Sequence, residues 1–169
     1  MGAYHAANQW RVLVIFLPTQ LLAAYLPVLS SLPMTHPVNL RHQQNRALGF
    51  MILFTLALSL PVVIMAPWLM QLFGAEFAVY WPLLVLVGLI PVFDIGHALL
   101  QQIAIAQDYV WTFLWSNLAM VIAVAIGLVW LIPQFLGLGL AVTLLLCYGF
   151  RLLVAYLIYF YRASTKMMI

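Results

Sequence analysis

The sequence predicts an all-α fold, a polytopic bundle of about five helices that cross a membrane. Of the 169 residues, 67% are hydrophobic and only 5% are charged, whereas a soluble domain carries roughly 25% charged residues. The apolar segments are each long enough to cross the hydrocarbon core, which takes about 20 residues. They lack the alternating polar pattern of barrel strands, so helices are the expected spanning element.

Each expected span ends at a polar, glycine-containing or proline-containing turn. The first boundary is a polar loop at residues 33–46, and later turns lie at residues 74–76, 107–108 and 133–137. The later turns are short, so the last four spans should pack as antiparallel neighbours. Residues 1–169 then form one transmembrane domain. Its expected spans are residues 12–32, 47–73, 79–106, 110–132 and 138–161.

Basic residues are distributed unevenly between the two ends of this bundle. The end with the first loop and the C-terminal tail carries Arg41, Arg46, Arg162 and Lys166, whereas the other end carries Arg11. Because basic residues favour the cytoplasmic side, we expect the C-terminus in the cytoplasm and the N-terminus outside. The first ten residues do not resemble a cleavable signal peptide. An outside N-terminus of this kind suggests a C-terminal fragment of a longer transporter.

Asp94 is the most informative polar residue, since it lies near the middle of the third expected span. A charged side chain there costs about 2.5–3.5 kcal/mol, so it normally faces protein or water. His97 and Gln101 lie on the same helical face as Asp94. One interpretation is the polar wall of a transport pathway, with proton coupling through Asp94 or His97. The alternative is an internal polar group that holds helices together.

Two arginines also fall within or beside the expected spans. Arg151 lies near the middle of the fifth span, at a depth similar to that of Asp94. Pairing of the two residues would lower the cost of both charges; alternatively, Arg151 faces a water-filled cavity and attracts an anionic substrate. Asn8 and Arg11 share one face of the first helix. Arg11 could line the outer mouth of a cavity, but an arginine that extends to the lipid headgroups is the simpler explanation.

The sequence offers little for catalysis or for metal binding. It contains three acidic residues and no motif of a nucleophile, a phosphate loop or a zinc protease. His36 and His42 lie in the basic loop without an acid or a cysteine nearby. We therefore expect no enzymatic activity, no catalytic residue, no metal, no cofactor and no nucleic-acid partner. The lipid bilayer is the expected surrounding of the chain.

The first expected span has the most distinctive sequence. Residues 4–11 read YHAANQWR, residues 16–18 read FLP and residues 26–30 read LPVLS. This pattern resembles the bacterial O-antigen and polysaccharide flippases (Wzx type) of the multidrug/oligosaccharidyl-lipid/polysaccharide exporter superfamily. In that family a Tyr-x-x-Ala-Asn segment opens the eighth helix and a Leu-Pro-x-Leu-Ser run closes it. Residues 72–74 (LFG) and 137–141 (GLGLA) are also similar, so the resemblance covers essentially the whole chain.

The resemblance implies helices eight to twelve of a twelve-helix, MATE-like transporter, which is a partial C-terminal lobe. It implies flipping of undecaprenyl-diphosphate-linked O-antigen or polysaccharide repeat units across the bacterial inner membrane. Partners would be the lipid-linked oligosaccharide, the missing N-terminal helices of the same transporter and the polysaccharide polymerase machinery. A proton or sodium gradient could supply the energy. The candidate pathway residues are Asn8, Arg11, Asp94, His97, Gln101 and Arg151.

Two other functions remain open from the sequence. The first is a multidrug or cation antiporter of the same superfamily. The second is a membrane assembly subunit that transports nothing. The YHAANQWR and LPVLS segments favour the flippase over the antiporter.

Overall fold

The computed structural model describes residues 2–31, 37–107 and 109–165, with side chains for residues 2–25, 42–107, 109, 111, 113–131 and 137–161. All the described secondary structure is helical, which confirms the predicted fold class. The elements are α1 (Gly2–Ser31), α2 (Pro37–Ile64), α3 (Ala66–Gln71), the 3-10 helix η1 (Ala75–Tyr80), α4 (Trp81–Ala106) and α5 (Val110–Thr165).

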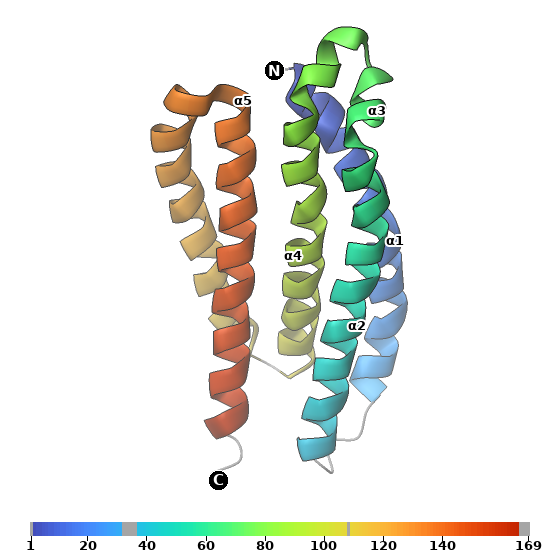
Figure 1. Ribbon diagram of the computed structural model, residues 1–169. Coiled ribbons are helices and arrows are strands. Elements are labelled where there is room, and N and C mark those ends of the chain that lie inside the picture. Colours follow the sequence, from blue (N-terminus) through green and yellow to red (C-terminus); the bar gives the residue numbers. More distant parts are fainter. Residues whose placement is uncertain (1, 32–36, 108, 166–169) are drawn as a thin grey trace.

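The long helices lie side by side and alternate in direction (Figure 1). Helix α1 runs down in this view, α2 runs up and α4 runs down again. Helix α5 is bent back on itself, so that its first arm rises and its second arm descends beside it. Within the described residues, α1 begins at the end of the bundle opposite to the one where α5 finishes (Figure 1).

Four of these helical segments are long and apolar enough to cross a membrane, and they are His42–Ile64, Ala75–Ala106, Phe113–Leu131 and Gly137–Tyr161. They correspond to the second to fifth expected spans. The first expected span, residues 12–32, lies within α1 for its described part. Helix α1 is not among the four, although it has 30 residues. Several apolar helices of this length are compatible with a multi-pass membrane protein.

The structure differs from the sequence prediction around the second span. Much of the expected polar loop at residues 33–46 is helical, because α2 begins at Pro37. Proline is favoured at the first helical position, where its missing N–H is not needed, and the arginines and glutamines that follow are good helix formers. The helix then passes through Pro61 and ends at Ile64, and α3 starts after Met65 with Pro67 in its first turn.

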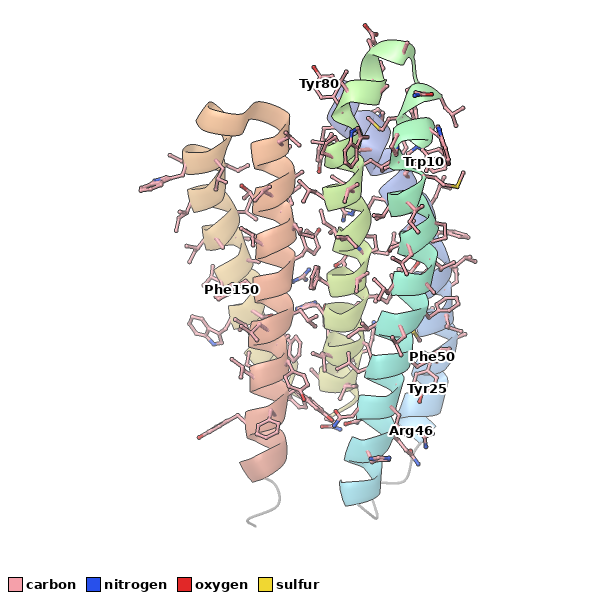
Figure 2. The ribbon with its side chains drawn as sticks, in the orientation of Figure 1. Trp10, Tyr25, Arg46, Phe50, Tyr80 and Phe150 are labelled. Carbon is pink, nitrogen blue, oxygen red and sulfur yellow. The ribbon has the colours of Figure 1, made fainter. Side chains whose placement is uncertain are left out.

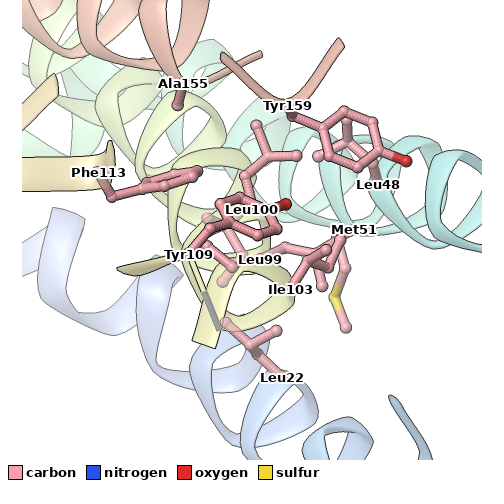
Figure 3. Packing of buried hydrophobic residues seen from close by; sticks show 12 residues of the cluster. Leu22, Leu48, Met51, Leu99, Leu100, Ile103, Tyr109, Phe113, Ala155 and Tyr159 are labelled. Atoms are coloured by element: carbon pink, nitrogen blue, oxygen red, sulfur yellow. The ribbon is translucent and has the colours of Figure 1, made fainter. Parts of the chain in front are cut away.

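Buried apolar residues form two clusters, one toward each end of the bundle. The upper cluster joins the start of α1 to α3, α4 and the second arm of α5, and its described members are Ala6, Ala7, Ala66, Met70, Leu83, Leu84, Val87 and Ala141. The lower cluster joins α1, α2, α4 and both arms of α5 (Figure 3). It includes Leu22, Leu48, Met51, Ile95, Leu99, Leu100, Ile103, Ala104, Tyr109, Phe113, Ala155 and Tyr159.

Helix α4 is the centre of the bundle. In the membrane-crossing segment of α4, 61% of the most apolar stretch is buried. In the first arm of α5, only 11% of the corresponding stretch is buried. The outward-facing side chains of the other helices are largely apolar, and Figure 2 shows Phe50 and Phe150 among them. Monomeric soluble proteins rarely expose large continuous apolar patches, so these faces require lipid or further helices as their surroundings.

Two glycines allow neighbouring helices to approach closely. Gly96 of α4 packs against the second arm of α5, where an added Cβ would lie 3.1 Å from Leu152 Cδ1. Gly127 lies between the two arms of α5, where an added Cβ would overlap the methyl group of Thr143 and lie 3.0 Å from its Oγ1. Small residues at such crossings let membrane helices pack without a gap.

We predict that Gly127→Ala destabilises the hairpin of α5 by about 1–3 kcal/mol, the usual cost of overpacking a tight contact. Gly49→Ala is the matched control, because Gly49 is exposed on α2 with nothing within 4 Å of an added Cβ. The control should stay within about 1 kcal/mol of the wild type. Unfolding in mixed detergent micelles, followed by circular dichroism, measures both values; equal stability of the two variants would contradict the close contact.

Candidate functional site

Three charged side chains meet inside the bundle. The Asp94 carboxylate of α4 lies between Arg11 of α1 and Arg151 of the second arm of α5. Its Oδ2 is 3.8 Å from Arg11 Nη2, and its Oδ1 is 3.6 Å from Arg151 Nη1. We call these three residues the arginine–aspartate cluster. Of the two alternatives for Arg151, the structure shows the pairing with Asp94, and Arg11 approaches the same carboxylate.

Arg11 contacts residues of other helices, which differs from the expected extension toward the lipid headgroups. Its guanidinium carbon lies 5.3 Å from the ring centre of Tyr148, and its Nη2 donates a hydrogen bond of 3.2 Å to the Tyr148 hydroxyl. A longer contact of 3.4 Å joins Arg11 Nη1 to Asn8 Oδ1. A charged group this deep is stabilised more by an aromatic face and a carboxylate than by a long reach to the surface.

Arg151 is also held by a neutral partner. It donates two hydrogen bonds to Asn117 Oδ1 on the first arm of α5, from Nε at 3.0 Å and from Nη2 at 2.7 Å. Its remaining Nη1 faces Asp94. Asn117 was missed by the sequence prediction, although an asparagine within an apolar span is itself a signal of an internal hydrogen bond.

The arginine–aspartate cluster lies between the two apolar clusters. Along α4, Asp94 comes between Val87 of the upper cluster and Ile95 of the lower one. Arg11 and Arg151 occupy the corresponding places on α1 and α5. The three charged side chains are 17% to 24% exposed, so each keeps limited access to the surroundings. Among the described residues at this depth, two positive charges face one negative charge, which leaves an excess of one positive charge.

His97 lies beside this cluster but has its own partner. It is 1% exposed, packs edge-on to Phe113 and places its Nε2 3.3 Å from Ser116 Oγ. The Ser116 hydroxyl already donates its proton to the Phe113 carbonyl oxygen at 2.8 Å. Ser116 Oγ can therefore only accept from His97, which assigns the proton of a neutral His97 to Nε2. This geometry corresponds to the interpretation of an internal group that joins helices.

The remaining candidate, Gln101, is half-buried one turn beyond His97 on α4. A second polar contact lies near that end of the bundle, where the Tyr159 hydroxyl donates to Gln44 Oε1 at 3.0 Å. It ties α2 to the second arm of α5 within the lower cluster. Both of its residues were missed from the sequence, because neither lies near the middle of an expected span.

A hollow of about 420 Å³ opens between α1 and α2, near their lower ends. Figure 2 shows Tyr25, Arg46 and Phe50 around it, and Leu21, Gln43, Ala47 and Met51 complete its lining. None of these residues belongs to the arginine–aspartate cluster. Within the part of the chain that is described, no three His, Cys, Asp or Glu side chains gather as metal ligands would. His36, considered above with His42, lies outside the described residues.

Comparison with known proteins gives no relative. No family model, no curated protein and no solved structure matches this chain.

The charge balance of the cluster predicts an order of stability among its variants. Asp94→Asn leaves two unneutralised arginines, whereas Arg11→Gln or Arg151→Gln leaves one neutral ion pair. We expect Asp94→Asn to lower the free energy of unfolding by about 1–3 kcal/mol, below the 3–5 kcal/mol of a fully buried pair. Each arginine variant should cost less. Unfolding in mixed micelles measures the order, and an arginine variant that costs more than Asp94→Asn would contradict the shared ion pair.

The hydrogen bond of His97 can be tested with two serines. Ser116→Ala should cost about 1–3 kcal/mol, because it leaves buried His97 Nε2–H without its acceptor. Ser59→Ala is the matched control, since Ser59 is 0% exposed like Ser116 but its hydroxyl has no hydrogen-bond partner among the described residues. The control should be neutral or stabilising. The same unfolding measurement compares them, and equal losses for both variants would exclude the proposed role of Ser116.

Proposed function

We propose that this chain is part of a membrane transporter that flips an undecaprenyl-diphosphate-linked oligosaccharide, such as an O-antigen repeat unit, across a bacterial inner membrane. The observation that supports it is the excess positive charge of the arginine–aspartate cluster, midway between the two apolar clusters. The diphosphate is the charged part of such a substrate, and moving a charged group through the apolar interior of a bilayer costs free energy. Fixed guanidinium groups along its route lower that cost, and their planar donors fit phosphate oxygens.

The charge balance also separates the alternatives. A cation antiporter would have to bring a cation toward Asp94, against the repulsion of Arg11 and Arg151. A purely structural polar contact needs no excess charge, because one arginine would neutralise one aspartate. Two arginines around one aspartate carry a net positive charge, which suits an anionic substrate. The YHAANQWR and LPVLS segments support the lipid-linked oligosaccharide within that class.

The proposed orientation places the C-terminus in the cytoplasm and the start of α1 in the periplasm. Arg11 is the basic residue that opposed this orientation in the sequence count, and its guanidinium is engaged inside the bundle. The exposed Arg46 remains near the lower end, the proposed cytoplasmic end (Figure 2). The exposed apolar faces of the α5 arms leave room for the remaining helices of a larger transporter, for lipid or for both.

The test is O-antigen display in a bacterial strain that lacks its own flippase. The chain is expressed alone and together with the upstream helices of a flippase from the same superfamily. We expect the combination to restore display, and Arg11→Gln or Arg151→Gln to reduce it at least about tenfold, which corresponds to losing roughly 1.4 kcal/mol. Arg46→Gln is the matched control, because its exposed side chain lies apart from the cluster and display should persist.

Two outcomes would refute the proposal. One is failure of the well-expressed combination to restore display. The other is wild-type display by both arginine variants of the cluster. Export of cationic dyes without any display would favour the antiporter instead, and membrane insertion without either activity would favour an assembly subunit.

A further inference from the structure

We propose that Asp94 is a built-in competitor of the transported anion. Its carboxylate occupies the space between Arg11 and Arg151 in the resting protein, and the diphosphate of the substrate displaces it on binding. This inference rests on the proposed function, since it assumes that the two arginines receive an anionic group. In this proposal Asp94 sets how tightly the substrate binds and how readily it is released, and is more than a structural partner of the arginines.

The contacts of Asp94 are loose. Its two oxygens lie 3.8 Å and 3.6 Å from the nearest arginine nitrogens. Charge-assisted hydrogen bonds between a guanidinium and a carboxylate are about 2.7–2.9 Å long. Asp94 is therefore attracted by both arginines without a direct hydrogen bond to either. Its side chain is 24% exposed, so another staggered rotamer could carry the carboxylate out of the gap.

The arginines, by contrast, are fixed by neutral groups. Asn117 accepts two hydrogen bonds from Arg151, and Tyr148 accepts one from Arg11 and offers its ring face. These partners lie on α5, whereas Asp94 lies on α4. Withdrawal of the carboxylate would leave both guanidinium groups in place. The two arginines thus keep partners of their own, and the Asp94 carboxylate is the group that occupies the space between them.

A diphosphate is the anion best able to take this place. Its two phosphoryl groups can each present oxygens to one guanidinium, whereas Asp94 offers one oxygen to each. It also brings more negative charge than the single carboxylate that it replaces. The displaced carboxylate remains nearby and repels the bound anion, which weakens binding and favours release. A transporter needs this balance, because a site that binds too tightly does not let its substrate leave.

The experiment measures binding of inorganic pyrophosphate to the purified full chain in lipid nanodiscs by calorimetry. We expect Asp94→Asn to bind pyrophosphate at least about tenfold more tightly than the wild type, a difference of roughly 1.4 kcal/mol. Asp94→Glu keeps a competing carboxylate and should not show this gain. Glu76→Gln is the matched control, because it removes the same charge from an exposed residue of η1 and should leave the affinity unchanged.

Stability gives a second measurement on the same variants. Pyrophosphate should raise the unfolding temperature of Asp94→Asn more than that of the wild type, since the stabilisation by a ligand grows with the logarithm of its concentration divided by Kd. If Asp94→Asn does not fold, Asp94→Ser takes its place in both measurements. Arg11→Gln and Arg151→Gln should each weaken binding in either background.

The outcomes separate this inference from the proposed function. If the wild type binds pyrophosphate through the two arginines but Asp94→Asn binds it equally or more weakly, Asp94 is not a competitor. The anionic route then stands and this inference is overturned. If neither the wild type nor the aspartate variants bind pyrophosphate, the cluster is no anion site, and both proposals lose their basis.

Discussion

The neutralisation of charge in an apolar surrounding is the constraint on which this bundle depends. A carboxylate midway along α4 can persist there because α1 and the second arm of α5 each bring an arginine to it. That requirement fixes how three helices are placed along and around each other. It also explains why α4 is central, since the helix with the buried acid needs neighbours on several sides. The two apolar clusters then fill the space above and below the charges.

Polar contacts away from the cluster also satisfy buried polar groups across two helices, but they join uncharged side chains. His97 is joined to Ser116 across α4 and α5, and Tyr159 to Gln44 across α5 and α2. Where lipid cannot hydrogen-bond, each such pair selects one arrangement of two helices from many that would bury similar apolar area. The hydrophobic residues decide that the helices associate with a membrane. The few polar residues decide which of their faces meet.

Much of this structure could be predicted from the sequence because its signals are strong. Long apolar segments predict the helical fold, and the similar depth of Asp94 and Arg151 makes their pairing one of two alternatives. The partners of Arg11 could not be predicted, since Asp94 and Tyr148 are far away from it in the chain. The helical start at Pro37 was hidden by polar residues that are compatible with loop or helix. The partnership of Asn117 with Arg151 likewise requires knowing that the two arms of α5 fold against each other.

Gly96 carries no charge, yet it lies only two residues from Asp94 and faces Leu152, the neighbour of Arg151. The close approach of α4 to α5 at this point keeps Arg151 within reach of the carboxylate. An added Cβ would press on the methyl groups of Leu152, and a large side chain would have to separate the two helices and lengthen the ion pair. The small size of residue 96 therefore serves the electrostatics of its neighbours as well as the packing. A residue without charge thus shares in the geometry of the charged site, through the distance that it sets between two helices.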